Sequence, residues 1–201
     1  MLTEVLFAGF GGQGIMLIGQ MLAYAGMNEG KQVCWLPSYG PEMRGGTAYC
    51  SVVVSDRPIG SPVVRNPQHV AVLNLPSLQK FGPRVKVGGL LLINSSLIDT
   101  TADRDDIDQL LVPANALALA AGNGKAANMA ILGAYLGRTG TVEIPTVEAL
   151  IRKQFAKKPE LAELNLEVLR RGIALGQPPV AAPEAPATTG ATPPAPGGGA
   201  Q

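Results

Sequence analysis

The chain has 201 residues, enough for one ordinary domain with its own hydrophobic core. Hydrophobic residues make up 46% of it, charged residues make up 15%, and the formal net charge is +1. No basic face stands out, which argues against nucleic acid as the main partner, while the low charge suggests that much of the surface is either apolar or covered by something else.

Cysteine and histidine content limits the metal chemistry. Cys34 and Cys50 lie in apolar, strand-like runs, so we expect buried free thiols in a reducing cytosol. No CxxC occurs, so we expect no ferredoxin-type cluster, and the single histidine, His69, cannot build a zinc site alone. Neither a signal peptide nor an apolar run of about 18 residues is visible, which predicts a cytoplasmic chain without membrane contact.

The predicted elements alternate between strands and helices. A strand at residues 4–8 precedes a helix at 13–27, and strands follow at 31–36 and 47–55. Next come strands at 69–73 and 86–94 around a helical turn at 76–81, and a short strand that ends near Val112. The remaining elements are helices at 114–121, 126–137, 145–155 and 159–175. This order predicts an α/β fold, a Rossmann-like three-layer sandwich.

The connection at residues 37–46 sets the direction of its two strands. It is too short, and lacks the helical pattern, for a parallel crossover. Strands 31–36 and 47–55 are therefore expected to run antiparallel, which makes the sheet mixed but mostly parallel.

The composition changes at the C-terminal end of the chain. Residues 176–201 are almost all Pro, Ala, Gly and Thr, and such a stretch cannot bury enough apolar surface to offset its chain entropy. We expect a folded domain at 1–175 and a disordered tail at 176–201, with a tether to a partner as the alternative role for the tail.

The first candidate site is a glycine turn with the spacing GxGxxG, formed by Gly9, Phe10, Gly11, Gly12, Gln13 and Gly14. Gly9 would permit a tight exit from the strand, and Gly11 and Gly12 would let another group approach the backbone. Gly14 would let the helix pack against the sheet. Free N–H groups at the helix start favour an anion such as phosphate, unless the turn is only structural and binds nothing.

A dinucleotide site needs more than this turn. An Asp or Glu should stand about 20 residues later, at the end of the second strand, to hold the ribose. That strand ends in Leu36, Pro37 and Ser38, without a carboxylate or a suitable arginine. No Gly-Lys-Ser/Thr follows the turn, so it is not a P-loop either. We therefore expect phosphate or a neighbouring backbone at the turn, not NAD.

The second candidate site is a loop formed by Ser38, Tyr39, Gly40, Pro41, Glu42, Met43, Arg44, Gly45 and Gly46. Its Gly-Pro and Gly-Gly pairs predict a shaped loop. Arg44 could hold a phosphate or carboxylate, and Tyr39 could stack on a ring or cover an interface. The loop follows the second strand, so we expect it at the same sheet edge as the glycine turn. The alternative is that Glu42 and Arg44 are surface charges on a turn.

Together, GFGGQGIMLIGQMLAYAG at 9–26 and PSYGPEMRGGTAYCSVVVS at 37–55 resemble the gamma subunit of the 2-oxoacid:ferredoxin oxidoreductases. The resemblance covers about residues 2–175, includes the helix at 128–133, and leaves out the tail. The loop is most similar to that of the 2-oxoglutarate and branched-chain members.

The resemblance implies a subunit of a cytoplasmic enzyme that converts a 2-oxoacid and coenzyme A to acyl-CoA and carbon dioxide, and reduces ferredoxin. It implies 2-oxoglutarate as the oxoacid substrate, with 2-ketoisovalerate or pyruvate as the alternatives. In this family the alpha and beta subunits hold thiamine diphosphate with its magnesium, and iron–sulfur clusters lie in beta or delta. The gamma chain would pack on them, carry no catalytic residue and no metal, and help enclose coenzyme A. The glycine turn and Arg44 would then lie near its phosphates or at a subunit seam.

Two other functions compete with this one. A free-standing NAD(P)-dependent oxidoreductase is disfavoured by the missing carboxylate. A non-catalytic nucleotide- or coenzyme A-binding module would bind its ligand without any partner. Lys125, at a predicted helix start, could reach a phosphate, although we expect it to be a solvated lysine.

Overall fold

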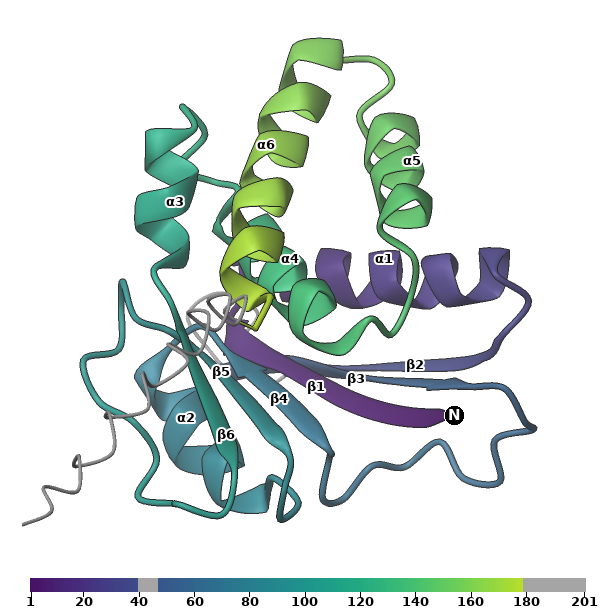
Figure 1. Ribbon diagram of the computed structural model, residues 1–201, viewed down its shortest axis with the longest axis vertical. Coiled ribbons are helices and arrows are strands. Elements are labelled where there is room, and N and C mark those ends of the chain that lie inside the picture. Colours follow the sequence, from purple (N-terminus) through teal and green to yellow (C-terminus); the bar gives the residue numbers. More distant parts are fainter. Residues whose placement is uncertain (40–46, 179–201) are drawn as a thin grey trace, which may run out of the picture.

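The computed structural model describes residues 1–39 and 47–178, whose strands form one six-stranded sheet in the order β2-β3-β1-β4-β5-β6 (Figure 1). The strands are β1 (Leu2–Phe10), β2 (Gln32–Tyr39), β3 (Thr47–Ser55), β4 (His69–Val72), β5 (Leu90–Asn94) and β6 (Asp108–Val112). β3 pairs antiparallel with both β1 and β2, and the pairs β1–β4, β4–β5 and β5–β6 are parallel. Only β3 runs against the others, which confirms the predicted mixed, mostly parallel sheet.

Helices cover the two faces of the sheet unequally. They are α1 (Ile15–Asn28), α2 (Leu75–Phe81), α3 (Ala114–Ala120), α4 (Ala127–Thr139), α5 (Ile144–Gln154) and α6 (Pro159–Gly176), with the 3₁₀ turn η1 (Gly82–Arg84). Figure 1 shows α2 on one face and the other helices on the opposite face. Alternate residues of β1 serve both cores: Val5 and Phe7 join the larger one, and Leu6 joins the smaller one under α2. The three layers predicted from the sequence are therefore present.

Several strand boundaries differ from the predicted ones, among them the ends of β1, and two of the differences have a clear local reason. β5 begins at Leu90 and not at residue 86, because Gly89 N–H donates to Lys86 O at 2.8 Å and Gly88 has a φ of 71°, which closes a turn. β2 continues beyond Pro37 to Tyr39. It lies at the edge of the sheet, where a residue without an N–H is tolerated.

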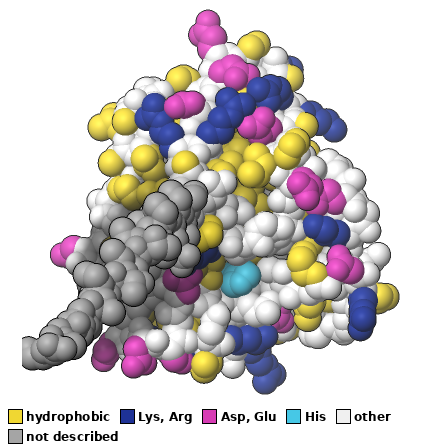
Figure 2. Space-filling view, in the orientation of Figure 1, with side chains coloured by type: hydrophobic (Ala, Val, Ile, Leu, Met, Phe, Trp, Pro, Cys, Tyr) yellow, Lys and Arg dark blue, Asp and Glu magenta, His cyan; other side chains and the backbone are white. Residues whose placement is uncertain are grey.

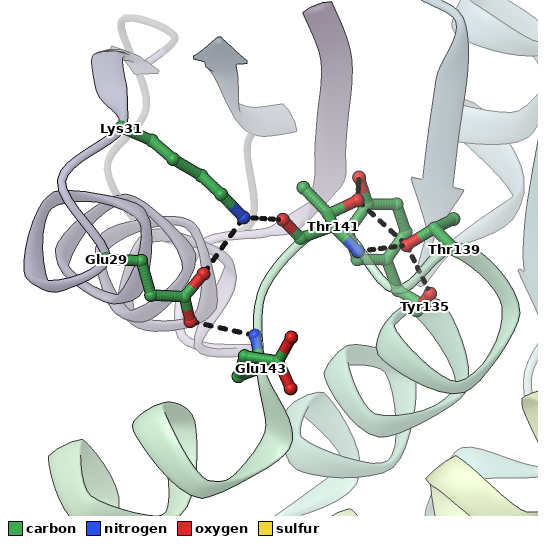
Figure 3. A network of polar contacts seen from close by, with 6 residues as sticks. All are labelled: Glu29, Lys31, Tyr135, Thr139, Thr141 and Glu143. Carbon is green, nitrogen blue, oxygen red and sulfur yellow. Dashed lines mark hydrogen bonds and ion pairs between the residues drawn. The ribbon is translucent and has the colours of Figure 1, made fainter. Parts of the chain in front are cut away.

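A polar network joins the end of α1 to the connection between α4 and α5 (Figure 3). Lys31 Nζ donates to the Glu29 carboxylate at 2.9 Å and to Thr141 O at 2.7 Å, and the Glu143 N–H donates to Glu29 at 2.8 Å. Burial raises the pKa of Glu29, but these hydrogen bonds lower it more, so its net pKa falls below the ordinary value. Tyr135 Oη lies 3.0 Å from Thr141 Oγ1 and extends the network into the core.

Parts of the sequence-based predictions fall outside the described residues. These are residues 40–46 of the second candidate loop and the tail beyond Pro178. Both thiols are free, as expected, but Cys34 is only half-buried whereas Cys50 is buried. Within the described ranges, none of the helices combines the length and the apolar character needed to cross a membrane.

Candidate functional site

The glycine turn forms one wall of a pocket at the edge of the sheet where the parallel strands end. We call it the carboxyl-edge pocket, and its volume is about 400 Å³. Its walls come from the glycine turn, the ends of β4 and β5, and the starts of α3 and α4. The lining residues are Gly12, Gln13, Leu73, Asn94, Asn115, Gly124, Lys125 and Ala127. Ligands of α/β proteins bind at this edge.

Within the turn, the glycines have roles that differ in part from the prediction. Gly9 belongs to β1 and pairs with Ala48, so the chain turns after it, through Gly12, which has a φ of 97°. Gly14 has a φ of 75°, and a Cβ there would lie 2.3 Å from Asn128 Nδ2. That amide donates to Gly14 O at 3.2 Å. Gly14 thus permits close packing against α4. The prediction that it would let the helix pack against the sheet was wrong.

Gln13 braces the turn from inside. Its Oε1 accepts the Phe10 N–H at 2.6 Å, and its own N–H donates to Phe10 O at 3.2 Å. Its Nε2 donates to Leu73 O at 3.5 Å, which is a weak contact. The side chain therefore fixes the turn at the end of β1 and points toward the end of β4.

Two asparagines form the opposite wall, and the sequence reasoning missed both. Asn94 ends β5 and is fully buried; its Nδ2 donates to Asn115 Oδ1 at 2.8 Å, and its Oδ1 accepts the Ser96 N–H at 3.3 Å. With its oxygen occupied, Asn115 presents amide N–H groups as donors. The signal for Asn94 was available in the sequence, because it is a polar residue directly after the apolar run Leu90 to Ile93.

The charge of the pocket favours an anion. Among the described residues that line it, Lys125 alone is charged, and it makes no ion pair with the described part of the chain. α1 and α4 both begin at the pocket, and neither has a side-chain cap or an acidic residue in its first turn. Their unpaired N–H groups and the ammonium group together suit a phosphate.

The second candidate loop can be placed only by its two ends. Ser38 and Tyr39 are the last residues of β2, Tyr39 pairs with Ala48, and Thr47 pairs with Phe10. Both ends therefore lie at the sheet edge of the glycine turn, as predicted. Glu42 and Arg44 belong to the part of the loop outside the described residues.

The described residues contain no group of three or more His, Cys, Asp or Glu side chains that could hold a metal ion.

Burial raises the pKa of the Cys50 thiol to about 12, so it stays protonated at neutral pH and is a poor nucleophile. The pocket has the means to bind and orient a ligand through Lys125 and backbone N–H groups.

Relatives of known function cover most of this chain. The ketoisovalerate oxidoreductase subunit VorA of Methanothermobacter marburgensis is 41% identical over 172 residues, which are 85% of this chain and 36% of VorA. This chain thus spans about a third of that relative. The 2-oxoglutarate synthase subunit KorC of Methanocaldococcus jannaschii is 32% identical over 176 residues, which are 86% of this chain and 92% of KorC.

Solved structures share the fold. The gamma subunit of a keto/oxoacid ferredoxin oxidoreductase from Geobacter sulfurreducens matches with a TM-score of 0.74 and 29% identity, over 87% of this chain and 98% of that one. The 2-oxoglutarate:ferredoxin oxidoreductase from Magnetococcus marinus, solved with 2-oxoglutarate, coenzyme A and succinyl-CoA bound, has a TM-score of 0.80 over 87% of this chain and 31% of that one. At 23% identity, the second match shows the fold alone. Residues 4–175 match the family described as pyruvate ferredoxin/flavodoxin oxidoreductase, and the chain belongs to that family.

Proposed function

We propose that this chain is the gamma subunit of a 2-oxoacid:ferredoxin oxidoreductase, with residues 1–175 as its domain. The complex would convert a 2-oxoacid and coenzyme A to acyl-CoA and carbon dioxide and pass two electrons to ferredoxin. Near-complete coverage of KorC and of the Geobacter gamma subunit supports this role. Alpha and beta subunits, with delta in some arrangements, would supply thiamine diphosphate, magnesium and iron–sulfur clusters in the cytoplasm.

The contribution of this chain would be to hold phosphate groups of coenzyme A in the carboxyl-edge pocket. The observation that carries this proposal is that Lys125 lies beside two uncapped helix starts, in a pocket whose described lining residues include no acidic one. A volume of about 400 Å³ suits part of coenzyme A and leaves the rest to partner subunits. Arg44 and its loop would serve as a second contact to the ligand or to a neighbouring subunit.

The identity of the oxoacid substrate is a more specific part of the proposal. Resemblance in the second candidate loop favours 2-oxoglutarate or a branched-chain oxoacid. The 41% identity to VorA favours 2-ketoisovalerate, and the 32% identity to KorC along nearly all of its length keeps 2-oxoglutarate as the alternative. Pyruvate ranks third, because the pyruvate synthase subunit PorC of Methanothermobacter thermautotrophicus is 29% identical.

Co-expression tests the proposal. The tagged chain would be produced with the genes beside its own, purified, and assayed for viologen reduction that depends on coenzyme A and on each oxoacid in turn. We expect activity from the complex and none from the chain alone. A chain that elutes alone beside well-expressed neighbours would contradict the proposal, and calorimetry with coenzyme A and NAD(P)H would then test the ligand-binding module and the free-standing oxidoreductase.

A further inference from the structure

Charged side chains are unevenly distributed along the chain. Among the described residues up to Ser55, only Glu4, Glu29 and Lys31 carry charged side chains, whereas charged residues recur throughout residues 56–178. These three are paired, Glu29 with Lys31 and Glu4 with Lys86. Figure 2 shows Lys and Arg side chains, mixed with acidic ones, gathered over the α5–α6 end of the molecule. The part of the molecule built from α1 and β1–β3 therefore has few charges to keep its surface in water.

α1 is the clearest case, because it is a surface helix without a charged residue. One side of it is buried in the larger core, as Ile18 and Leu22 show. The opposite side, which we call the α1 outer face, carries the half-buried Met16, Leu17 and Gln20 and the exposed Tyr24 and Met27 at helical spacing. Met16 and Leu17 also pack in part against the larger core. Tyr24 is 53% exposed and Met27 is 58% exposed. A solvated helix face normally carries charge, whereas Tyr, Met and a lack of charge mark the core of a protein interface.

We infer that the α1 outer face is the docking surface for a partner subunit, which meets it with an apolar, uncharged surface. The inference rests on the proposed function. Relatives indicate the occupant: the matching region is 36% of VorA but nearly all of KorC. In VorA this domain is thus joined covalently to further chain, whereas KorC consists of little beyond the domain, so an equivalent of that further chain would have to be held by a non-covalent interface. The occupant is the subunit equivalent to that remainder.

The position of the face relative to the pocket supports this assignment. α1 starts directly after the glycine turn, so Met16 and Leu17 stand in the first helical turn beyond Gly12 and Gln13 of the carboxyl-edge pocket. A subunit docked on the α1 outer face would therefore border the proposed coenzyme A site. Stable interfaces bury about 800 Å² per partner, so this face would form the apolar centre of a larger contact.

Charge substitutions test the inference in the co-expressed complex. Tyr24→Glu and Met27→Glu should each reduce the amount of partner subunit that co-purifies at least tenfold, because a charge would be buried without a counter-ion. Val87→Glu is the matched control, since Val87 is 79% exposed and lies outside this face. Thermal unfolding of each chain by circular dichroism should stay unchanged.

The outcomes separate the inference from the proposed function. If the wild-type chain captures the partner subunit and the Tyr24→Glu and Met27→Glu variants capture as much, the inference is overturned and the proposed function stands. No capture by the wild type overturns both. A dimer of this chain that the same substitutions abolish also overturns the inference, since the face would then serve a second copy. Hydroxyl-radical labelling of Tyr24 and Met27 gives a readout without variants: protection in the complex is expected, and labelling at the rate of the free chain would contradict it.

Discussion

Gly133 of α4 lies so close to α6 that a Cβ on it would stand 2.1 Å from the backbone oxygen of Leu169. The relationship is reciprocal, because a Cβ on Gly172 of α6 would stand 2.2 Å from Ala130 O. The same pattern recurs one turn later with Gly137 and Gly176. Each helix thus presents two glycines, four residues apart, to the backbone of the other, and this seam anchors the helical layer.

Replacing one glycine of this seam tests how close the helices are. Gly133→Ala should lower the free energy of unfolding by about 3 kcal/mol, because the added methyl group meets rigid backbone. At an exposed helix position the same change would raise the free energy of unfolding by about 1 kcal/mol. The sign of the measured change therefore tells whether Gly133 is in close contact with α6. Urea unfolding followed by circular dichroism measures it. Gly60→Ala, with open space around its Cβ, is the control and should change stability little.

The sequence predicted the elements well where the signal is local. Apolar strands, Pro at helix starts and the short connection at 37–46 were sufficient for the element order and for the antiparallel β2–β3 pair, which the register Trp35 to Val52 confirms. The α4–α6 seam could not be predicted in this way, because its glycines are far apart along the chain. Only the fold brings Gly133 and Gly172 to the same place.

Prediction of the candidate site was partial for the same reason. The glycine turn and its sheet edge followed from one continuous stretch. The remaining walls, with Asn94 of β5, Asn115 of α3 and Lys125 before α4, come from three separate parts of the chain, and no local pattern links them. The contact between Gly14 and Asn128 likewise depends on how α4 meets α1.

Two glycines of the turn should respond differently to alanine. Gly12→Ala should cost about 1 kcal/mol of stability, because Gly12 has a positive φ but open space around its Cβ. Gly14→Ala should cost about 3 kcal/mol, because the added methyl group also meets the Asn128 side chain. Removing that side chain with Asn128→Ala should then make the Gly14→Ala cost smaller than in the wild type. Strictly additive costs in urea unfolding would show that the contact does not matter.

Removing the charge of Lys125 tests the proposed ligand contact. Lys125→Ala in the assembled enzyme should raise KM for coenzyme A about tenfold and leave kcat unchanged, because a lost charge-assisted contact weakens binding alone. KM for the oxoacid should stay the same. Lys153→Ala is the control, since Lys153 is likewise exposed, makes no ion pair with the described residues, and lies in α5. A wild-type KM for coenzyme A in Lys125→Ala would remove the lysine from the proposal.

His69 should make stability depend on pH in a narrow window. Its Nδ1 lies 3.3 Å from Tyr135 Oη, and burial lowers the pKa of His69 below the ordinary 6.5. The unfolded chain therefore takes up the proton more readily than the folded chain. The stability that the protein has with His69 neutral is complete above about pH 6.5. It is lost as the pH falls from there toward the pKa of His69 in the folded protein.

His69→Gln separates this effect from the carboxylates. The variant carries no titrating group at the position, so its free energy of unfolding should fall less than that of the wild type between about pH 7.5 and pH 5. Glu148 acts in a different window, because its hydrogen bond from Arg170 lowers its pKa below 4.5. Urea unfolding at a series of pH values measures both chains. Parallel curves over this range would mean that the folded protein tolerates a charged imidazole at His69, and that burial beside Tyr135 does not hold the ring neutral.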